Sequence, residues 1–446
     1  MNRADAAVAY FDAHRDAFLA DLAALCRVPG ISSGDREPVR RSAEATAALL
    51  RKYGLQNVQL LEVEGAHPSV YADVMTGGGP TLLLYAHHDV QPVGDRARWT
   101  HDPFDPVERD GRLFARGSSD DKAGVVALVA AAASWLATAG TLPCNVKFFI
   151  EGEEEIGSPN LGRFLEQYGA RLAADCVILA DSPNFDTGIP ALTYRLRGMA
   201  QIDVEVRCLE RPLHSGRGAG VVPDAVAILC RLLTSLHIDD VATISAEERA
   251  ALGSLDIDAK RFRRDAGLLD GVELLADDAI PERLWTQPSI TITAFEARPI
   301  AGAINQILDS ARARLSIRTV PNIDSREAGE TIVKQLTTSP PANARVTARV
   351  IAHAPWWRTD AIGPAYDAAR GALAKGYGRE PVMQGAGGTI AFVRQFADAF
   401  EGIPLILLGV EDPPCNAHSE DESLSLDDWE KCTRSAIYFF EELAKS

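Results

Sequence analysis

Residues 81–92 have the sequence TLLLYAHHDVQP, in which a continuous apolar run ends abruptly in His87, His88 and Asp89. Continuous apolar runs are typical of strands whose two faces are both covered by helices. Three further runs share this character: VKFFI (146–150), CVILA (176–180) and PLILLGV (404–410). The sequence therefore predicts an α/β sheet whose strands come from two segments lying far apart in the chain.

The middle of the chain has a different pattern, in which apolar and polar residues alternate. The alternation occurs in AQIDVEVRCL (200–209), ARARLSIR (311–318) and RVTARVIA (345–352), with helical patterns at 223–236 and 325–336. Alternation indicates antiparallel strands with one solvated face. We therefore predict a catalytic domain made of residues 1–198 and 353–446, with an α+β domain, residues 199–352, inserted into it. The stretch 237–288 is too irregular to support a prediction.

Composition excludes several classes of partner. The 446 residues carry 45 Lys and Arg against 62 Asp and Glu, a formal net charge of −17. Such a surface repels phosphate groups, which argues against nucleic acid and anionic membranes. The seven cysteines are scattered without a C-x-x-C pair, which indicates reduced thiols in a cytoplasm. Residues 123–140 lack charge but are rich in alanine, so a buried helix is favoured over a membrane span.

Polar residues gather where the apolar strands end. His87, His88 and Asp89 follow the first run, and Glu151–Glu155, Asp181 and His418 follow the others. In open α/β sheets, ligands bind outside the carboxyl ends of the strands. A single polar site at this edge is therefore predicted, and the alternative is a solvated rim of loops.

Local spacing favours a metal site among these residues. His87 and Asp89 are two apart, so on an extended segment they point the same way, and the carboxylate can orient an imidazole that binds metal. Asp120 and Asp121 lie in a glycine-containing turn, where the carboxylate of one would have two oxygens for two cations, and a helix cap is the alternative that the other could form. The run Glu153–Glu155 requires cations to offset its repulsion, unless it is a solvated acidic turn.

Nine motifs in order resemble those of the M20 metallopeptidases. They are AHHDVQP (86–92), DPF (102–104), ARGSSDDKAG (115–124), IEGEEEIGS (150–158), YRLRG (194–198), LHSG (213–216), IRTVPN (317–322), GGT (387–389) and AHSEDE (417–422). The forms D-V-Q-P and D-D-K are most similar to the cytosolic dipeptidase and carnosinase branch. The resemblance implies a zinc-peptidase-like catalytic domain, with a mixed sheet flanked by helices, and an inserted ferredoxin-like lid and dimerisation domain.

The resemblance also implies roles at the metal centre. His87 and Asp181 resemble ligands of one metal, Glu155 and His418 ligands of the other, and Asp120 the carboxylate that bridges them. The bridging aspartate of the family commonly precedes a cis peptide. Glu154 resembles the general base, and Asp89 the residue that orients His87. The implied cofactors are two divalent metal ions, zinc first, with manganese or cobalt suiting the same ligands.

In the inserted domain the resemblance implies substrate contacts. His214 is similar to the family's lid histidine, which reaches into the neighbouring subunit's site and polarises the scissile carbonyl, so a homodimer is expected. Arg318 is similar to the arginine that grips the substrate carboxylate. The resemblance further implies that Asn305 is a polar contact of the lid. It also implies that the backbone of the loop Gly387, Gly388 and Thr389 touches the substrate.

The expected function is hydrolysis of the amide bond in dipeptides or short peptides that have a free C-terminal carboxylate. One departure keeps an alternative open, because Gly385 and Ala386 stand where dipeptidases of the family often have Arg-Glu before this loop. An N-acyl-amino-acid deacylase or glutamate-type carboxypeptidase, acting on an N-acyl amino acid or peptide, is therefore the second hypothesis. A catalytically inactive binding protein is the third, against which the complete set of ligands argues.

Overall fold

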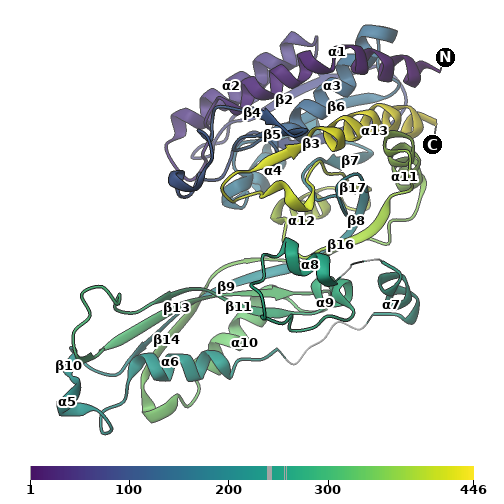
Figure 1. The fold of residues 1–446 in the computed structure, drawn as a ribbon. Coiled ribbons are helices and arrows are strands. Elements are labelled where there is room, and N and C mark those ends of the chain that lie inside the picture. The colour runs from purple at the N-terminus through teal and green to yellow at the C-terminus, as the bar shows by residue number, and fades with distance from the viewer. Residues whose placement is uncertain (1, 239–243, 256, 258, 446) are drawn as a thin grey trace. The chain divides into compact units, whose positions relative to one another are not determined.

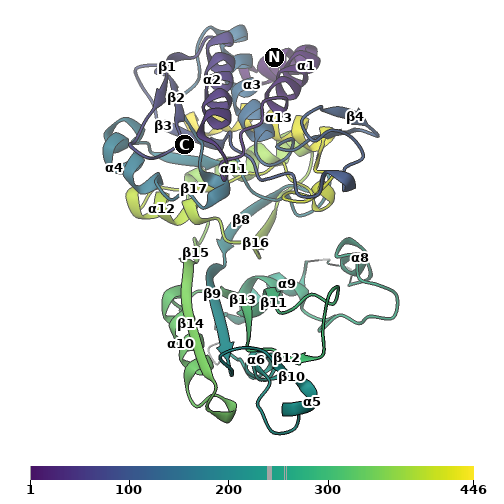
Figure 2. The same cartoon turned by 90° about the vertical axis from the view of Figure 1, so that its left-hand side faces the viewer.

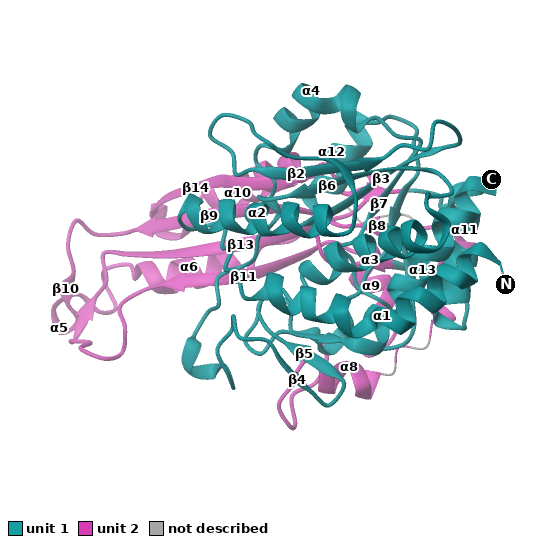
Figure 3. Cartoon of the chain, turned by 90° about the horizontal axis from the view of Figure 1, so that it is seen from above, with its two compact units in different colours: residues 1–194, 359–384, 390–446 teal, residues 195–358, 385–389 magenta. Residues whose placement is uncertain are grey.

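The computed structural model describes residues 2–238, 244–255, 257 and 259–445, and the chain forms two compact units (Figure 3). The first unit contains Met1–Tyr194, Thr359–Gln384 and Ile390–Ser446. The second contains Arg195–Arg358 and Gly385–Thr389. The mixed α/β fold predicted from the strand patterns is confirmed.

A nine-stranded mixed sheet organises the first unit, and β15 and the last residues of β8 and β16 in this sheet are counted with the second unit (Figure 1). Its order is β1-β2-β6-β3-β7-β17-β8-β15, with β16 paired to β8. The central strands β6, β3, β7 and β17 are parallel, whereas β1 and β2 are antiparallel. The bounds are β1 (Gln56–Leu61), β2 (Ser69–Val74), β3 (Thr81–His87), β6 (Asn145–Glu151), β7 (Cys176–Leu179), β8 (Ala191–Leu196), β15 (Trp357–Arg358), β16 (Val382–Ala386) and β17 (Leu405–Leu407). The four predicted apolar strands thus lie side by side, although one of them comes from the far end of the chain.

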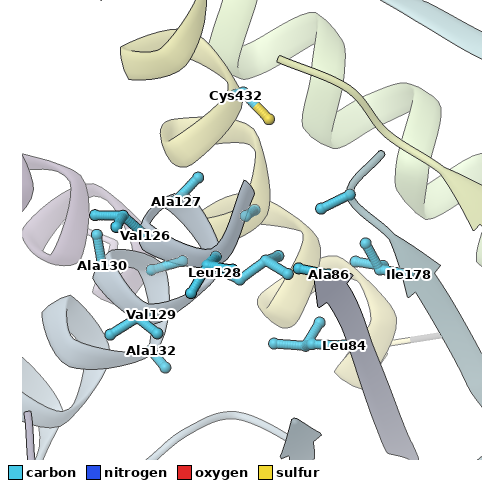
Figure 4. Close-up of a cluster of buried hydrophobic side chains, with 14 of the residues drawn as sticks. Leu84, Ala86, Val126, Ala127, Leu128, Val129, Ala130, Ala132, Ile178 and Cys432 are labelled. Carbon is cyan, nitrogen blue, oxygen red and sulfur yellow. The ribbon is translucent and has the colours of Figure 1, made fainter. Parts of the chain in front are cut away.

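Helices cover both faces of this sheet because successive side chains of a strand point to opposite sides. Leu84 and Ala86 of β3 pack with Leu128 of α3 in the main core (Figure 4). Tyr85 points the other way and lies against Phe392, with ring centroids 4.2 Å apart. The helices of this unit are α1 (Arg3–Cys26), α2 (Arg36–Lys52), α3 (Lys122–Ala139), α4 (Leu161–Leu172), α11 (Pro364–Tyr377), α12 (Ala391–Ala399) and α13 (Leu426–Lys445), with short 3-10 turns at Arg96–Arg98, Glu154–Ile156 and Pro413–Cys415.

Helix α3 is apolar and long enough to cross a membrane, yet most of it is buried inside the unit. It packs against α1 and α13, and the indole of Trp135 donates a hydrogen bond to the Ile437 carbonyl (3.0 Å). The predicted buried helix is what the structure contains. A small sheet of β4 (Val107–Arg109), β5 (Arg112–Phe114) and β18 (Ser423–Ser425) lies beside the turn that leads into α3.

The second unit is built on a four-stranded antiparallel sheet in the order β11-β13-β9-β14 (Figure 2). The elements follow one another as βαββαβ: β9 (Gly198–Arg207), α6 (Ala225–Thr234), β11 (Ser289–Glu296), β13 (Ser310–Thr319), α10 (Ser325–Thr337) and β14 (Arg345–Ala354). This is the ferredoxin-like order. Burial alternates along β9 and β13, and the apolar face packs on α6 and α10, as the sequence pattern predicts.

The remaining elements of the second unit are short. The stretch 237–288, for which we made no prediction, contains α7 (Ala246–Gly253), α8 (Ala259–Asp265) and α9 (Ile280–Thr286) within the described residues. A ribbon of β10 (Leu213–His214) and β12 (Gln306–Ile307) adjoins α5 (Ser215–Gly218), and Pro341–Asn343 form a 3-10 turn.

The unit boundaries differ in detail from the predicted 198/199 and 352/353. The structure divides the chain at 194/195 and 358/359, because Arg195 and Leu196 at the end of β8 pair with β15. The loop Gly385–Thr389 also belongs to the second unit rather than to the C-terminal catalytic segment. Side-chain hydrogen bonds from Arg197 and Arg318 hold this loop, and local sequence patterns carry no signal of such contacts.

Candidate metal centre

Two histidines and one aspartate form the middle of a polar cluster in the first unit. The Nε2 atom of His87, at the end of β3, lies 2.9 Å from Asp120 Oδ1. The Nε2 atom of His418 lies 2.9 Å from the other oxygen, Asp120 Oδ2. Asp120 therefore faces two imidazoles with its two oxygens. The peptide bond between Asp120 and Asp121 is cis.

Two further carboxylates complete two donor groups around Asp120. Asp181 Oδ2, which follows β7, lies 3.9 Å from His87 Nε2. Glu155 Oε2, after β6, lies 3.1 Å from His418 Nε2. In each group, His87–Asp120–Asp181 and Asp120–Glu155–His418, the donor atoms lie within 4.8 Å of one another. The five residues expected as metal ligands are thus brought together in two sets that share Asp120.

Burial and charge make this cluster suited to cations. The side chain of His87 is fully buried, and those of Glu155 and Asp181 are 2% and 13% exposed, whereas that of His418 is 58% exposed. Burial and the Asp120 charge raise the pKa of Asp181 and of Glu155 to about 7. Buried carboxylates that cluster in this way repel one another unless cations or protons neutralise them. Two imidazoles and three carboxylates are ligands that zinc and similar divalent ions accept.

Glu154 lies next to this cluster without belonging to either donor group. Its Oε2 atom is 4.0 Å from His87 Nε2, and its side chain is 17% exposed. Burial and the negative charge of Asp181 hold the pKa of Glu154 well above its usual range. A carboxylate whose pKa is raised toward neutrality is suited to accept and return a proton.

Asp89 holds the loop that carries Glu154 and Glu155. Its carboxylate accepts hydrogen bonds from the backbone N–H groups of Glu154 (3.2 Å) and Glu155 (3.1 Å). The same carboxylate lies 3.4 Å from His87 Nδ1, which is also 3.1 Å from the Asp89 carbonyl oxygen. Asp89 is fully buried, so these contacts fix the imidazole and the loop together. The contact with the loop is additional to the orienting role that we expected.

Glu422 holds the turn that carries Asp120, a role that the sequence did not reveal. Its carboxylate accepts hydrogen bonds from the backbone N–H groups of Gly117 (3.0 Å), Ser119 (2.9 Å) and Asp120 (3.1 Å). It also pairs with Arg116 Nη1 at 2.7 Å, and both side chains are almost completely buried. Both residues lie in the motifs ARGSSDDKAG and AHSEDE, but only the fold brings these motifs together.

We expect Glu422→Gln to weaken metal binding about 10–100-fold, as loss of residues that position ligands generally does. The amide cannot accept all of these hydrogen bonds, and Arg116 would remain buried without its counter-charge. That should lower the free energy of unfolding by about 3–5 kcal/mol. Calorimetric titration with zinc would measure the metal affinity, and unfolding in urea would measure the free energy of unfolding. Glu401→Gln, at an exposed position, is the control, and equal behaviour of the two variants would contradict the role.

A partly buried ion pair holds the loop that carries His418. Arg112 of β5 binds both carboxylate oxygens of Asp412, at 2.7 and 2.6 Å, and donates to the Ser423 hydroxyl (2.9 Å) and carbonyl (3.0 Å). Arg112 therefore clamps residues on both sides of His418. Thr187 also donates to Asp412, at 2.7 Å. This support was missed in the sequence because its partners are about 300 residues apart.

The metal-free protein should become less stable as pH rises. The folded state keeps protons on Asp181 and Glu155 up to about pH 7, whereas carboxyl groups of the unfolded chain release them near pH 4. Contacts with Asp120 and Glu155 raise the pKa of His418 to about 11, which acts in the same direction above pH 6.5. Burial lowers the pKa of His88 to about 4, so below pH 6.5 this histidine binds a proton more readily in the unfolded chain. His88 therefore opposes the effect of the other groups, but it contributes only one proton. The free energy of unfolding therefore falls between pH 5.5 and pH 8.

Differential scanning calorimetry of chelated protein should thus give a lower Tm at pH 8 than at pH 5.5. Zinc-loaded protein should show the opposite order, because cations bind deprotonated ligands and compete with protons. A chelated protein that is more stable at pH 8 would contradict the charge balance described above.

The expected lid residues lie together at the β10–β12 ribbon of the second unit. His214 is exposed, and its Nδ1 accepts a hydrogen bond from the Gly216 N–H group (3.1 Å). His214 pairs with Gln306 across the ribbon, and the Asn305 carbonyl accepts from the Ser215 N–H group (3.1 Å). The Asn305 side chain bonds the Ser215 hydroxyl.

The expected carboxylate-binding residues form a second group within the same unit. Arg318 Nη1 donates to Thr389 Oγ1 (2.7 Å), which in turn donates to the Arg197 carbonyl (2.6 Å). Arg197 Nε donates to the Gly387 carbonyl (2.9 Å). The structure therefore joins Arg318 to the loop of Gly387, Gly388 and Thr389. Arg197, in the motif YRLRG, was not assigned a role from the sequence.

Comparison with known proteins places the chain in a family. The model of peptidase family M20/M25/M40 matches residues 83–442. A cysteinylglycine-S-conjugate dipeptidase of Corynebacterium striatum is 33% identical over 389 residues, which cover 86% of this chain and 85% of that relative. Beta-Ala-His dipeptidase of Homo sapiens is 30% identical over 387 residues, which cover 82% of this chain and 75% of that relative.

A solved structure supports the same assignment. The M20 family metallo-carboxypeptidase Sso-CP2 of Sulfolobus solfataricus superposes with a TM-score of 0.83 at 27% identity, covering 96% of this chain and 99% of that one. The family match spans most of the chain, including His87, Asp120, Glu155, Asp181 and His418. The chain belongs to peptidase family M20/M25/M40 and is a metallopeptidase of that family.

Proposed function

We propose that the protein is a binuclear metal-dependent dipeptidase that cleaves the amide bond of dipeptides or short peptides with a free C-terminal carboxylate. One observation carries the binuclear centre: each oxygen of Asp120 lies 2.9 Å from the Nε2 atom of a different histidine. A carboxylate in that position can bridge two cations, with His87 and Asp181 on one side and Glu155 and His418 on the other. Zinc is the proposed metal, and manganese or cobalt suits the same donors.

Two divalent cations held there would lower the pKa of a bound water and polarise the scissile carbonyl. Glu154 then removes the proton of the attacking water and returns it to the leaving amine. Its raised pKa and its place outside both donor groups support this assignment. Asp89 keeps Glu154 in place through the backbone of the loop.

Substrate contacts are proposed for the second unit. Arg318 offers a guanidinium fork matched to the terminal carboxylate of the substrate. The loop of Gly387, Gly388 and Thr389, which is hydrogen-bonded to Arg318, is proposed to contact the substrate as well. His214, with Asn305 beside it, would stabilise the developing oxyanion in the site of a neighbouring subunit. The active form is accordingly a homodimer associated through the second unit, which serves as lid.

The named activities of the relatives support dipeptides as substrates, since both curated relatives are dipeptidases. All seven cysteines are free thiols, which supports a reducing compartment such as the cytoplasm.

A second candidate is a carboxypeptidase or N-acyl-amino-acid deacylase. The observation in its favour is Ala386, which offers no carboxylate for a free substrate amine where dipeptidases of the family often have a glutamate. The similarity to a metallo-carboxypeptidase supports the same alternative. These activities share the metal centre and differ in the acyl side of the substrate.

A metal-reconstituted activity screen separates the candidates. Chelated protein would be loaded with zinc, manganese or cobalt and assayed against dipeptides, longer peptides, and N-acetyl and N-succinyl amino acids. We expect dipeptides to be cleaved fastest and chelated protein to be inactive. Turnover of N-acyl amino acids without turnover of any dipeptide would replace the first proposal by the second, and activity without metal would overturn both.

Mixing two inactive variants tests the role of His214. His214→Ala should lack the oxyanion contact and Glu154→Gln the base. If His214 acts across subunits, a mixed dimer contains one intact site, so equal mixing should restore up to about a quarter of wild-type activity, because half of the dimers are mixed and each has one working site. Subunit exchange would be followed by native mass spectrometry. Complete exchange without recovered activity would contradict action across the dimer.

A further inference from the structure

Two arginines lie at the same end of the four-stranded sheet in the second unit. Arg318, in β13, is opposite Ser289 of β11 and Met199 of β9. Arg197 directly precedes β9, and its Nη1 atom lies 3.4 Å from the Ser289 hydroxyl and 3.4 Å from the Gln287 carbonyl oxygen. Its guanidinium therefore reaches across to the strand that flanks Arg318.

The loop at Gly387–Thr389 ties the two arginines together. Thr389 Oγ1 accepts from Arg318 Nη1 and donates to the Arg197 carbonyl, at 2.7 and 2.6 Å. Gly387 accepts from Arg197 Nε, and a Cβ atom at this glycine would lie 3.2 Å from Arg197 Nη2. A side chain at position 387 would therefore contact that nitrogen. Nη2 of Arg197, and Nε and Nη2 of Arg318, have no hydrogen-bond acceptor among the described residues.

Among the described residues, these two positive charges lack a counter-charge. Neither guanidinium forms an ion pair with a carboxylate in the described part of the chain, and both side chains are partly buried. Burial together with the charge of Arg318 lowers the pKa of Arg197 to about 10, and burial lowers that of Arg318. Holding two like charges close together and partly out of water costs free energy that an anionic ligand would offset.

We propose that Arg197 and Arg318 together form a dicationic seat that selects substrates whose C-terminal residue is aspartate or glutamate. This proposal rests on the proposed peptidase function and deepens it by naming the substrate class. A neutral C-terminal residue brings one carboxylate and leaves one guanidinium uncompensated. An acidic residue brings two carboxylates, one for each fork, through charge-assisted hydrogen bonds of the kind that arginine forms best.

Ala-Glu and Ala-Gln test the seat because they are nearly the same size and differ in one charge. Metal-loaded wild-type protein should show kcat/KM at least about 10-fold higher for Ala-Glu, since a hydrogen-bonded charge pair contributes about that factor or more. Arg197→Gln should lower kcat/KM for Ala-Glu at least about 10-fold more than it lowers kcat/KM for Ala-Gln. Arg197→Lys, which keeps the charge without the fork, should fall between the two.

Arg349→Gln is the matched control, because this exposed arginine of β14 lies in the same unit and its loss changes the net charge equally. Its ratio of Ala-Glu to Ala-Gln turnover should equal that of wild type. Thermal melting and metal content would verify that each variant is folded and loaded. Equal turnover of the two peptides by wild type, or a uniform loss with Arg197→Gln, would overturn the seat and leave Arg197 as a residue that only positions the loop.

A binding experiment separates this proposal from the peptidase function. Glutarate and its monoamide, 4-carbamoylbutanoate, would be titrated calorimetrically into wild type and Arg197→Gln. The seat predicts at least about 10-fold tighter binding of glutarate to wild type and loss of that preference in the variant. This result without cleavage of any peptide would support the seat and overturn the proposed function. Peptide cleavage without a preference for glutarate would overturn the seat alone.

Discussion

Glu154→Gln is expected to lower kcat about 10²–10⁴-fold, the range that a positioned general base contributes. The amide has the shape of the carboxylate but cannot take a proton from water. Glu154 lies outside both donor groups, so the variant should keep its metal ions. Steady-state kinetics with a dipeptide, together with metal analysis by mass spectrometry, would test both statements.

A matched control for this variant is Glu166→Gln, at an exposed position of α4. That substitution makes the same chemical change away from the cluster, and its kinetics should equal those of wild type. Wild-type activity of Glu154→Gln would assign the proton transfer to another group. Loss of activity accompanied by loss of metal would show instead that Glu154 is a ligand.

Replacing Asp120 by asparagine should have the largest effect on metal binding, because this residue takes part in both donor groups. An amide has no charge and offers one oxygen where the carboxylate offers two. Changes to residues that merely support a ligand reduce affinity 10–100-fold, so we expect a reduction of more than about 100-fold for each ion. Dialysed Asp120→Asn should contain less than one metal per chain and show no detectable hydrolysis.

Asp110→Asn controls for the loss of one carboxylate. Asp110 is exposed and has φ 52°, a conformation that asparagine adopts readily. This variant should bind metal as wild type does. If Asp120→Asn kept two tightly bound ions per chain, the bridging role would be wrong and two separate sites would have to be sought.

The central sheet could be predicted from the sequence because burial on both faces leaves a distinct signal. The runs at 81–86, 146–150, 176–180 and 404–410 correspond to β3, β6, β7 and β17. Alternation predicted β9 and β13 for a related reason, since one face of each is buried and the other is not. The described residues of the stretch 237–288 contain short helices with few buried apolar side chains, so no periodicity marked it.

The candidate site, like the fold, could be predicted from the sequence only in part. Residues at strand ends, such as His87 and Asp181, could be placed at one edge from the strand pattern, and the family resemblance supplied their roles. Glu422 and Arg112 could not be found, because their effect depends on contacts with segments about 300 residues away. The Arg197–Arg318 pair likewise depends on the register of β9, β11 and β13, which no local pattern specifies.

The position of β17 has a consequence for how the protein is made. This strand pairs with β7 on one side and β8 on the other, yet roughly 200 residues separate it from β8. Those residues take about 10–40 s to leave the ribosome at ordinary rates of synthesis. During that time β7 lacks its neighbour and exposes an unpaired backbone edge, which invites wrong pairing. His418 and Glu422 also arrive last, so the metal centre forms only when translation is nearly complete. Premature termination before β17 should therefore give an insoluble, metal-free chain rather than a partially active enzyme.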